Sequence, residues 1–216
     1  MVLLTRSERD NVLKRFPRFE LSYEERIHKK VHSSEDIFAI IPYGSKFFAW
    51  FTYFGAHKCC IIIELAPNKN IKQMHIANTC FDNDLSIGVG TIFYGTIFNN
   101  RFFVVEDVYY YMGLDYSNHN YISRIKQIAH AFNEKIKQVS FTHNSIVFSP
   151  AIMSTDYNTI IEKSQDVPYQ VYGIRIVNYN LNNKHRIFIH KQDKYIHEAI
   201  FKVKATIQAD IYDAYY

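Results

Sequence analysis

The sequence predicts an α+β fold with mostly antiparallel strands and two or three helices. From residue 37, short apolar or alternating runs follow one another between Gly, Pro and Asn residues, as in antiparallel strands joined by turns. Residues 121–139 carry apolar residues at helical spacing. The 216 residues show no internal repeat or low-complexity linker, so we expect one domain over residues 1–216.

The N-terminal part contains two candidate helices. Residues 6–15 (RSERDNVLKR) predict a short helix with Ser7 as its N-cap, which Pro17 interrupts. Residues 23–32 predict a second one. Here Ser22 is followed three positions later by Glu25, which is the spacing of a capping box.

The middle of the chain predicts strands. Those of a first meander are expected at residues 37–44, 46–54 and 58–65, with turns at Pro42–Ser45 and Gly55–His57. A loop covers 78–90. Residues 90–98 and 101–111 predict a hairpin, because Asn99–Asn100 is a favourable pair for a two-residue turn.

The clearest helix lies at residues 121–139, where one face carries Ile122, Ile125, Ile128, Ala129, Phe132 and Ile136. A further helix is expected around 155–165. Residues 170–180 and 185–191 predict a hairpin around Leu181–Lys184, and residues 195–213 fit no single pattern.

Composition limits the function classes. The net charge is +4 and the pI is about 8.8, which permits a polyanionic partner without demanding one. The cysteines Cys59, Cys60 and Cys80 form no CxxC pair, so neither a zinc ribbon nor a disulfide framework is indicated. A charged N-terminus and the lack of a long apolar run predict a cytoplasmic protein without a membrane partner. Abundant Ile, Asn, Lys, Tyr and Phe suit an AT-rich genome, such as that of a large DNA virus.

Common catalytic and metal motifs are missing. The glycine-rich stretch GVGTIFYG lacks the GK[ST] ending of a phosphate loop and leads into a strand. His28 and His32 have the spacing of metal ligands on a helix, but no HExxH or acidic third ligand accompanies them. We therefore expect no metal and no cofactor.

Three tyrosines, Tyr109–Tyr111, end the second strand of the predicted hairpin. A buried tyrosine hydroxyl needs a partner, so the rings either pack with partners in the core or form a platform for a flat ligand. On strand alternation Tyr109 and Tyr111 share one side and Tyr110 points away. Trp50, the one tryptophan of the chain, carries the same ambiguity.

Five segments in order carry a resemblance over about residues 20–190: LSYEE (21–25), IPYGSKFFAWFTYF (41–54), GTIFYGTIF (90–98), RFFVVEDVYYYMG (101–113) and VPYQVYGIRIV (167–177). Together they resemble the nucleotidyltransferase core of mRNA guanylyltransferases and polynucleotide ligases, and are most similar to snurportin-type cap-binding domains. The resemblance implies a core of curved antiparallel sheets.

The motifs of the catalytic relatives are incomplete. The family's KxDG lysine, which attacks the nucleotide α-phosphate, would correspond to Lys46, but Phe47, Phe48 and Ala49 follow it. The DGE motif reads Tyr94, Gly95, Thr96, and the later acidic-Gly motif reads Tyr172, Gly173. Because these carboxylates bind ribose and metal in the family, the departures predict a protein that is not an enzyme.

The cap-binding relatives imply specific site residues. Their base-stacking tryptophan lies four residues after an Asp and two before a Gly, an offset that from Asp107 and Gly113 reaches Tyr111. Their LS pair, which contacts the base, matches Ser22. We expect the cap base at Tyr111, Tyr109, Ser22 and Trp50, and the cap triphosphate at Lys46 and Lys58. Tyr stands where the family has Trp, and the family's arginine-rich N-terminal helix for an import receptor is missing.

The leading hypothesis is a non-catalytic protein that binds the methylated 5′ cap of RNA, in translation initiation or RNA transport, with other proteins of an RNA-handling complex as further partners. Two alternatives remain open. The fold could serve as a structural or assembly subunit, or Lys46 could act in a divergent guanylyltransferase.

Overall fold

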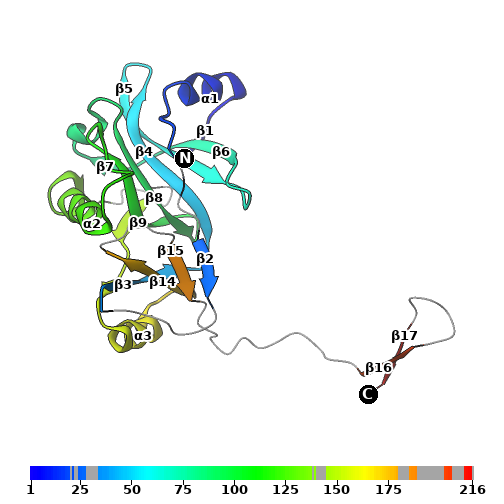
Figure 1. Ribbon diagram of the computed structural model, residues 1–216. Helices are drawn as coiled ribbons and strands as arrows, with labels where there is room; N and C mark the ends of the chain where they lie inside the picture. The colour runs from blue at the N-terminus through cyan, green and yellow to red at the C-terminus, as the bar shows by residue number, and fades with distance from the viewer. Residues whose placement is uncertain are drawn as a thin grey trace.

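The computed structural model describes residues 1–19, 21, 24–27, 34–137, 139, 145–179, 185–188, 202–205 and 212–215. The strands form two large sheets (Figure 1). The larger sheet has the order β1-β6-β5-β4-β8-β9-β10, with β12 parallel to β9. Its strands are β1 (Val2–Leu3), β4 (Ser45–Phe54), β5 (His57–Leu65), β6 (Ile71–Ala77), β8 (Thr91–Phe98), β9 (Phe102–Tyr111), β10 (Leu114–Asp115) and β12 (Val147–Pro150).

The smaller sheet has the order β13-β3-β14-β15-β2, and β2 runs parallel to β15. Its strands are β2 (Glu24–Ile27), β3 (Asp36–Pro42), β13 (Met153–Ser154), β14 (Val171–Asn178) and β15 (His185–Phe188). Two short pairs complete the strands: β7 (Cys80–Phe81) with β11 (Ile136–Lys137), and β16 (Lys202–Ala205) with β17 (Tyr212–Tyr215).

The described residues include three α-helices: α1 (Arg6–Leu13), α2 (Tyr121–His130) and α3 (Tyr157–Asp166). A 3₁₀ turn, η1 (Asn83–Ser86), and a π turn, η2 (Ala131–Lys135), are the remaining helical elements among the described residues. The α+β class with mostly antiparallel strands is thereby confirmed. No helix in the described ranges is both long enough and apolar enough to cross a membrane.

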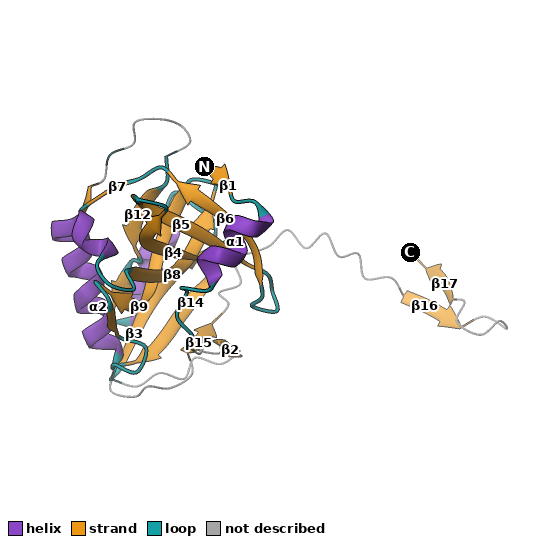
Figure 2. Ribbon diagram, turned by 90° about the horizontal axis from the view of Figure 1, so that it is seen from above, coloured by secondary structure: helices purple, strands orange, loops and turns teal. Residues whose placement is uncertain are grey.

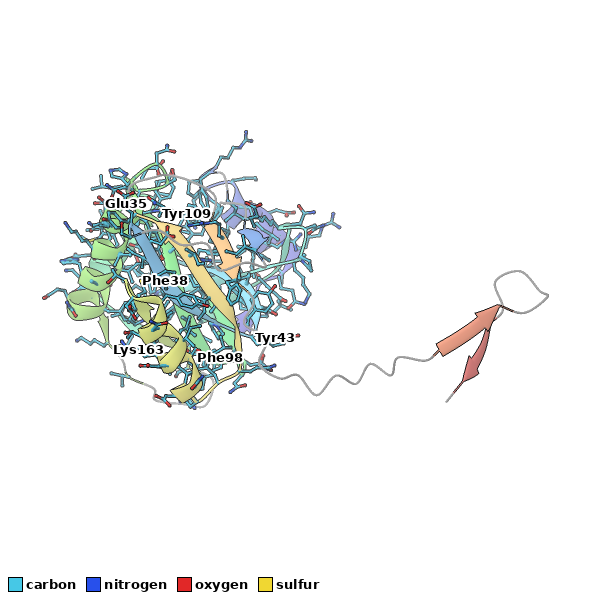
Figure 3. The ribbon with its side chains drawn as sticks, turned by 60° about the horizontal axis from the view of Figure 1, so that its bottom comes forward. Glu35, Phe38, Tyr43, Phe98, Tyr109 and Lys163 are labelled. Atoms are coloured by element: carbon cyan, nitrogen blue, oxygen red, sulfur yellow. The ribbon has the colours of Figure 1, made fainter. Side chains whose placement is uncertain are left out.

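The larger sheet has an apolar core on each side, and Figure 2 shows α2 and α1 on opposite sides of this sheet. On one side, Ile128 of α2 packs with side chains such as Phe51, Phe93 and Phe148. On the other side, Val12 of α1 packs with side chains such as Leu4, Trp50, Ile63 and Tyr109. The third helix, α3, covers the smaller sheet through Ile160, which packs with Phe38 and Ile40, and Figure 3 shows Phe38 beside this helix.

The predicted hairpins are confirmed, but the single meander is wrong. β8 pairs with β9 around Asn99 and Asn100, whose φ angles of 49° and 54° suit a two-residue hairpin turn. β4 pairs with β5 and β14 with β15 as expected. However, β3 pairs with β14 in the other sheet. β6 (Ile71–Ala77) was not among the predicted strands.

The predicted helices are correct in part. α1 begins at Arg6, and its N-cap is Thr5 rather than Ser7, because Thr5 and Glu8 form the capping box. α2 follows the predicted periodicity but turns into η2, and Ile136 pairs with Phe81 instead of continuing the helix. The helix over 23–32 is wrong where the structure describes it, because Glu24–Ile27 pairs with β15. Residues 28–33, which include His28 and His32, lie outside the described residues.

Candidate functional site

Two bulges in β9 decide where its acidic and aromatic side chains point. Val105 and Asp107 pair with Gly95 and Tyr94, so Glu106 is an extra residue. Val108 and Tyr110 pair with Phe93 and Ile92, so Tyr109 is a second extra residue. Each bulge interrupts the strict alternation of a strand.

As a result, the tyrosines are not arranged as predicted. Tyr109 and Tyr110 pack in the core under α1, whereas Tyr111 packs in the core under α2. The expectation that Tyr109 and Tyr111 share one side of the sheet is therefore wrong, and the bulge at Tyr109 is the reason.

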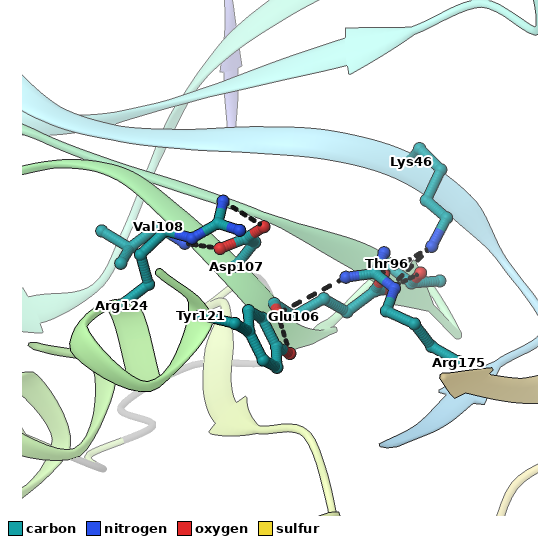
Figure 4. Close-up of polar contacts among 8 residues, drawn as sticks. All are labelled: Lys46, Thr96, Glu106, Asp107, Val108, Tyr121, Arg124 and Arg175. Atoms are coloured by element: carbon teal, nitrogen blue, oxygen red, sulfur yellow. Dashed lines mark hydrogen bonds and ion pairs between the residues drawn. The ribbon is translucent and has the colours of Figure 1, made fainter. Parts of the chain in front are cut away.

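Glu106 is a buried carboxylate that binds side chains from three other strands (Figure 4). Lys46 Nζ of β4 donates to both of its oxygens, at 2.8 and 2.7 Å. Arg175 Nη2 of β14 donates to Oε2 at 2.5 Å, and the Thr96 hydroxyl of β8 donates to Oε1. The Lys46 side chain is 23% exposed, whereas those of Glu106 and Arg175 are 0% exposed. The cluster therefore joins the two sheets and reaches solvent through Lys46.

Asp107 forms a second buried ion pair. Its Oδ2 accepts from Arg124 Nη1 of α2 at 2.9 Å, and its Oδ1 accepts from the backbone N–H of Val108 at 2.8 Å. Burial raises the pKa of Asp107, against the opposing effect of the Arg124 and Arg175 charges. The Tyr121 hydroxyl, also from α2, donates to the Glu106 carbonyl oxygen at 3.0 Å (Figure 4). Together these contacts fix β9 against α2, β4 and β14.

A group of packed aromatic rings lies beside the Glu106 cluster. We call it the aromatic face and define it by Phe48, Trp50, Tyr94 and Tyr109. Tyr94 stands edge-on to Tyr109 with their centroids 6.3 Å apart. Lys46 Nζ lies 5.4 Å from the Tyr94 centroid, and Arg175 Cζ lies 5.8 Å from it. Rings and cations are therefore neighbours on one side of the larger sheet.

The chain after α1 covers the aromatic face. Phe19 stacks on Tyr109, with their centroids 4.5 Å apart and their planes at 20°. Phe16 meets Trp50 edge-on at 5.1 Å. Trp50 is 1% exposed, and its Nε1 donates to the Val89 carbonyl oxygen at 2.8 Å. The structure thus brings two predicted base-binding rings, Tyr109 and Trp50, into one cluster, and both are buried.

Tyr111 lies on the other side of the sheet and is 4% exposed. Its hydroxyl is 2.5 Å from Nδ1 of His130 on α2. Burial raises the pKa of Tyr111 to about 12. In this conformation neither face of the Tyr111 ring is open to a base.

The two predicted phosphate-binding lysines lie at opposite ends of a strand pair. Lys46 lies opposite Thr96 near the start of β4, whereas Lys58 lies opposite Tyr53 near its end. Seven residues of strand separate Lys46 from Tyr53, which corresponds to about 23 Å. Lys58 Nζ instead contacts the Asn83 carbonyl oxygen at 3.4 Å. One triphosphate therefore cannot bind both lysines, and Ser22 lies outside the described residues.

Sequence reasoning missed Glu106, Arg175 and Phe19 as members of the site. A signal existed for the first two, because each is a charged residue inside an otherwise apolar strand, VVEDV and GIRIV. Phe19 gave no signal, since it follows a proline in an irregular segment. Only the fold places its ring against Tyr109.

The cysteines and other metal-binding side chains form no metal site in the described residues. Cys59, Cys60 and Cys80 are free thiols. Burial raises the pKa of Cys59 to about 11 and also raises that of Cys60. Throughout the described ranges, no three His, Cys, Asp or Glu side chains gather closely enough to hold a metal ion.

Comparisons with models of known protein families and with curated proteins find no match to this chain. Its functional interpretation therefore depends on the residues themselves.

Proposed function

We propose that this chain is a non-catalytic RNA 5′ cap-binding protein that acts in translation initiation or RNA transport in the cytoplasm. The observation that carries the proposal is the contiguous run of Phe19, Tyr109, Tyr94 and Lys46, in which an aromatic stack leads to a partly exposed cation. A capped nucleotide has the same order of parts, a flat base followed by phosphates.

A nucleotidyltransferase-like core is part of this proposal. Lys46, Thr96, Glu106 and Arg175 come from four of the five segments that carry the sequence resemblance, and they meet around one carboxylate. Segments that are far apart in the chain thus converge as a shared nucleotide site would require. This convergence supports the resemblance beyond the order of the segments.

The proposed platform for the base is Tyr109 rather than Tyr111. Phe19 already lies nearly parallel to Tyr109 at 4.5 Å, which is an arrangement that a purine could adopt in its place. Stacking of a base on an aromatic ring contributes about 1–3 kcal/mol. The positive charge of a methylated guanine adds a cation–π contribution of roughly 0.5–2 kcal/mol. A methylated base can therefore compete with Phe19 for the ring.

Lys46 is the proposed partner of the cap phosphates. Its ammonium group is held by the buried Glu106 but retains exposure to solvent, so it can add a phosphate oxygen to its acceptors. Arg175 lies behind it and supports the local positive potential. Lys58 is too distant to join them and has no part in this proposal.

The divergent-enzyme alternative rests on the same lysine. Nucleotidyl transfer needs a lysine amine that is available to attack phosphorus, whereas the Lys46 Nζ is engaged by both oxygens of the buried Glu106. The missing KxDG residues point the same way. Incubation with labelled GTP or ATP and a divalent metal separates the two readings, because only the enzyme forms a covalent lysyl nucleotide.

The test of the proposed function is a fluorescence titration, since Trp50 is the one tryptophan and lies in the same cluster as Tyr109. Capped dinucleotide, uncapped dinucleotide and GTP are compared on the natural chain, Phe19→Ala and Phe16→Ala. We expect saturable binding of the capped ligand alone. Phe19→Ala should bind it about 2- to 12-fold more tightly, because the competing aromatic pair is worth about 0.5–1.5 kcal/mol.

Phe16→Ala is the matched control, because the Phe16 ring meets Trp50 edge-on at 5.1 Å, whereas the ring stacked on Tyr109 is that of Phe19. Its affinity for the capped ligand should match that of the natural chain. Weaker binding of the capped ligand by Phe19→Ala would contradict the proposal that the base displaces Phe19 from Tyr109. It would instead place Phe19 on the second face of the base. If the folded protein bound none of the three ligands, the structural-subunit alternative would replace this proposal.

A further inference from the structure

A basic pocket lies where the N-terminus of α1 meets β6. Its lining combines the side chains of Arg6, Arg9, Lys72 and Gln73 with the apolar residues Leu3, Leu4 and Met74. Its volume is about 290 Å³. Three of the described lining residues are cationic and none is acidic. The pocket therefore has the size and charge to hold a phosphate group.

Local structure places these cations together. β1 pairs with β6 through Val2–Ile76 and Leu3–His75, and the Leu4 N–H donates to the Met74 carbonyl oxygen at 3.0 Å. α1 begins immediately afterwards, so Arg6 and Arg9 stand three residues apart on one helix face. Like charges at this spacing repel each other, which favours a bound anion.

Arg9 gives the pocket an unused donor. Its Nη1 donates to the Lys72 carbonyl oxygen at 3.4 Å. Its Nε is buried and has no hydrogen-bond partner in the described structure. A buried guanidinium N–H without an acceptor is unfavourable, and a phosphate oxygen is the acceptor that a guanidinium group matches best.

Two carboxylates that neighbour the lining residues, Glu8 and Glu64, are already engaged. Glu8 accepts from the backbone N–H and hydroxyl of Thr5, at 2.8 and 2.6 Å, and these bonds lower its pKa. Glu64 accepts from Lys72 Nζ at 2.7 Å. Glu64 can neutralise only Lys72, so the two arginines supply the positive charge that faces the pocket.

We propose that this basic pocket binds a backbone phosphate of the RNA strand that follows the cap. The inference rests on the proposed function. Leu4 lines the pocket and also packs in the core that contains Trp50 and Tyr109, so the pocket lies on the same side of the larger sheet as the aromatic face. Arg15 and Arg18, which are both exposed, follow α1 in the segment that leads to Phe19.

The experiment measures the affinity of the full chain for a capped dinucleotide, a capped RNA of about 10 nucleotides and the same RNA without its cap. Arg6→Ala/Arg9→Ala is compared with Lys126→Ala/Lys163→Ala, which removes the same charge from exposed positions on α2 and α3. Figure 3 shows Lys163 on α3. Inorganic phosphate is added as a competitor to distinguish a site for the free ion.

We expect the capped longer RNA to bind more tightly than the capped dinucleotide. Arg6→Ala/Arg9→Ala should weaken binding of the longer RNA by about 5-fold at 0.1 M salt, because one single-strand phosphate contact contributes about 0.7 to the slope of log K against log salt concentration. The capped dinucleotide should bind this variant unchanged, which also shows that the variant folds. Arg6→Glu, a change of an exposed residue, tests the same loss without altering Arg9, whose Nε is buried.

The outcomes separate this inference from the proposed function. The pocket proposal is overturned, and cap binding is left intact, if the capped longer RNA binds no more tightly than the capped dinucleotide. The same holds if the Arg6→Ala/Arg9→Ala variant gains as much affinity from the longer RNA as the natural chain does. If the capped dinucleotide does not bind but uncapped RNA binds and loses its affinity in the variant, the pocket stands and the cap site fails. If millimolar inorganic phosphate competes with the RNA and the affinity does not depend on RNA length, the pocket is a site for the free ion and the RNA proposal is overturned.

Discussion

At the scale of single residues, Glu106 is the most connected charged group in the described site. It has no exposed surface, and its oxygens accept hydrogen bonds from Lys46, Arg175 and Thr96. A buried carboxylate loses its hydration, so it is stable only when charged donors and hydrogen bonds replace water. Its partners come from β4, β8 and β14, which makes Glu106 a link between the two sheets.

We therefore predict that Glu106→Gln lowers the free energy of unfolding by about 3–5 kcal/mol. The amide keeps the size of the side chain but removes the charge that Glu106 presents to the fully buried Arg175. Urea denaturation followed by Trp50 fluorescence measures the change.

Glu64→Gln is the matched control, because its partner Lys72 has a side chain that is 56% exposed. An ion pair of that kind contributes less than about 1 kcal/mol. Equal losses in the two variants would show that the burial of Glu106 adds nothing to the energy of its ion pairs.

At the scale of elements, two irregular positions in β9 decide where its acidic and aromatic side chains point. The bulge at Glu106 lets Glu106 and Asp107 reach different partners, and the bulge at Tyr109 separates that ring from Tyr111. Gly95 of β8 lies opposite the first bulge. A Cβ atom built on Gly95 would lie 2.0 Å from the Val104 carbonyl oxygen and 2.6 Å from Cε1 of Phe103. The bulged arrangement therefore requires glycine there.

Gly95→Ala should lower the free energy of unfolding by about 3 kcal/mol, because backbone must move to admit the methyl group. Gly55→Ala is the comparison. Gly55 has a φ angle of +59°, but no atom lies within 4 Å of a Cβ built there. Gly55→Ala should therefore lower the free energy of unfolding by about 1 kcal/mol. Chemical denaturation of both variants checks the difference. A similar small cost at both positions would mean that β8 and β9 shift easily around the bulge.

The bulges also explain what the sequence could and could not predict about the site. The Asn99–Asn100 turn has a local signature, and the hairpin was predicted correctly. A bulge depends on the partner strand and on packing, and it leaves the apolar pattern of β9 unchanged. The offset of four residues from Asp107, taken from the family resemblance, therefore reached Tyr111, whereas the ring beside Tyr94 and the cations is Tyr109.

At the scale of the whole molecule, the sequence predicted the fold class but not which strands belong to which sheet. Apolar runs and helical periodicity are local patterns, and they predicted most strands as well as α2 and α3. Pairing between β3 and β14 joins Ile40 to Ile174 across more than half the chain. Single-sequence patterns say little about such partners. The same limit applies to residues 24–27, where pairing with β15 overrides a helix signal.

The long-range arrangement also separates the two candidate phosphate lysines, which leads to a last prediction. Lys46 lies by Glu106 and Tyr94, whereas Lys58 lies by Asn83 and Tyr53 at the other end of β4 and β5. If the cap phosphates bind at Lys46, Lys46→Met should weaken binding of the capped dinucleotide by about 10- to 100-fold, since a hydrogen bond to a charged group is worth about 1.5–3 kcal/mol. Lys58→Met should leave that affinity unchanged.

Methylguanosine, which has the base without phosphates, distinguishes a phosphate contact from a general loss of structure. Lys46→Met should bind this nucleoside as the natural chain does, because the stack on Tyr109 does not use the ammonium group. Equal weakening toward the nucleoside and the capped dinucleotide would show that Lys46 acts only by holding Glu106 and the two sheets in place. Titration of both ligands against the natural chain and both lysine variants decides between these roles. A phosphate contact would make the ion-pair cluster that joins the sheets part of the ligand site itself.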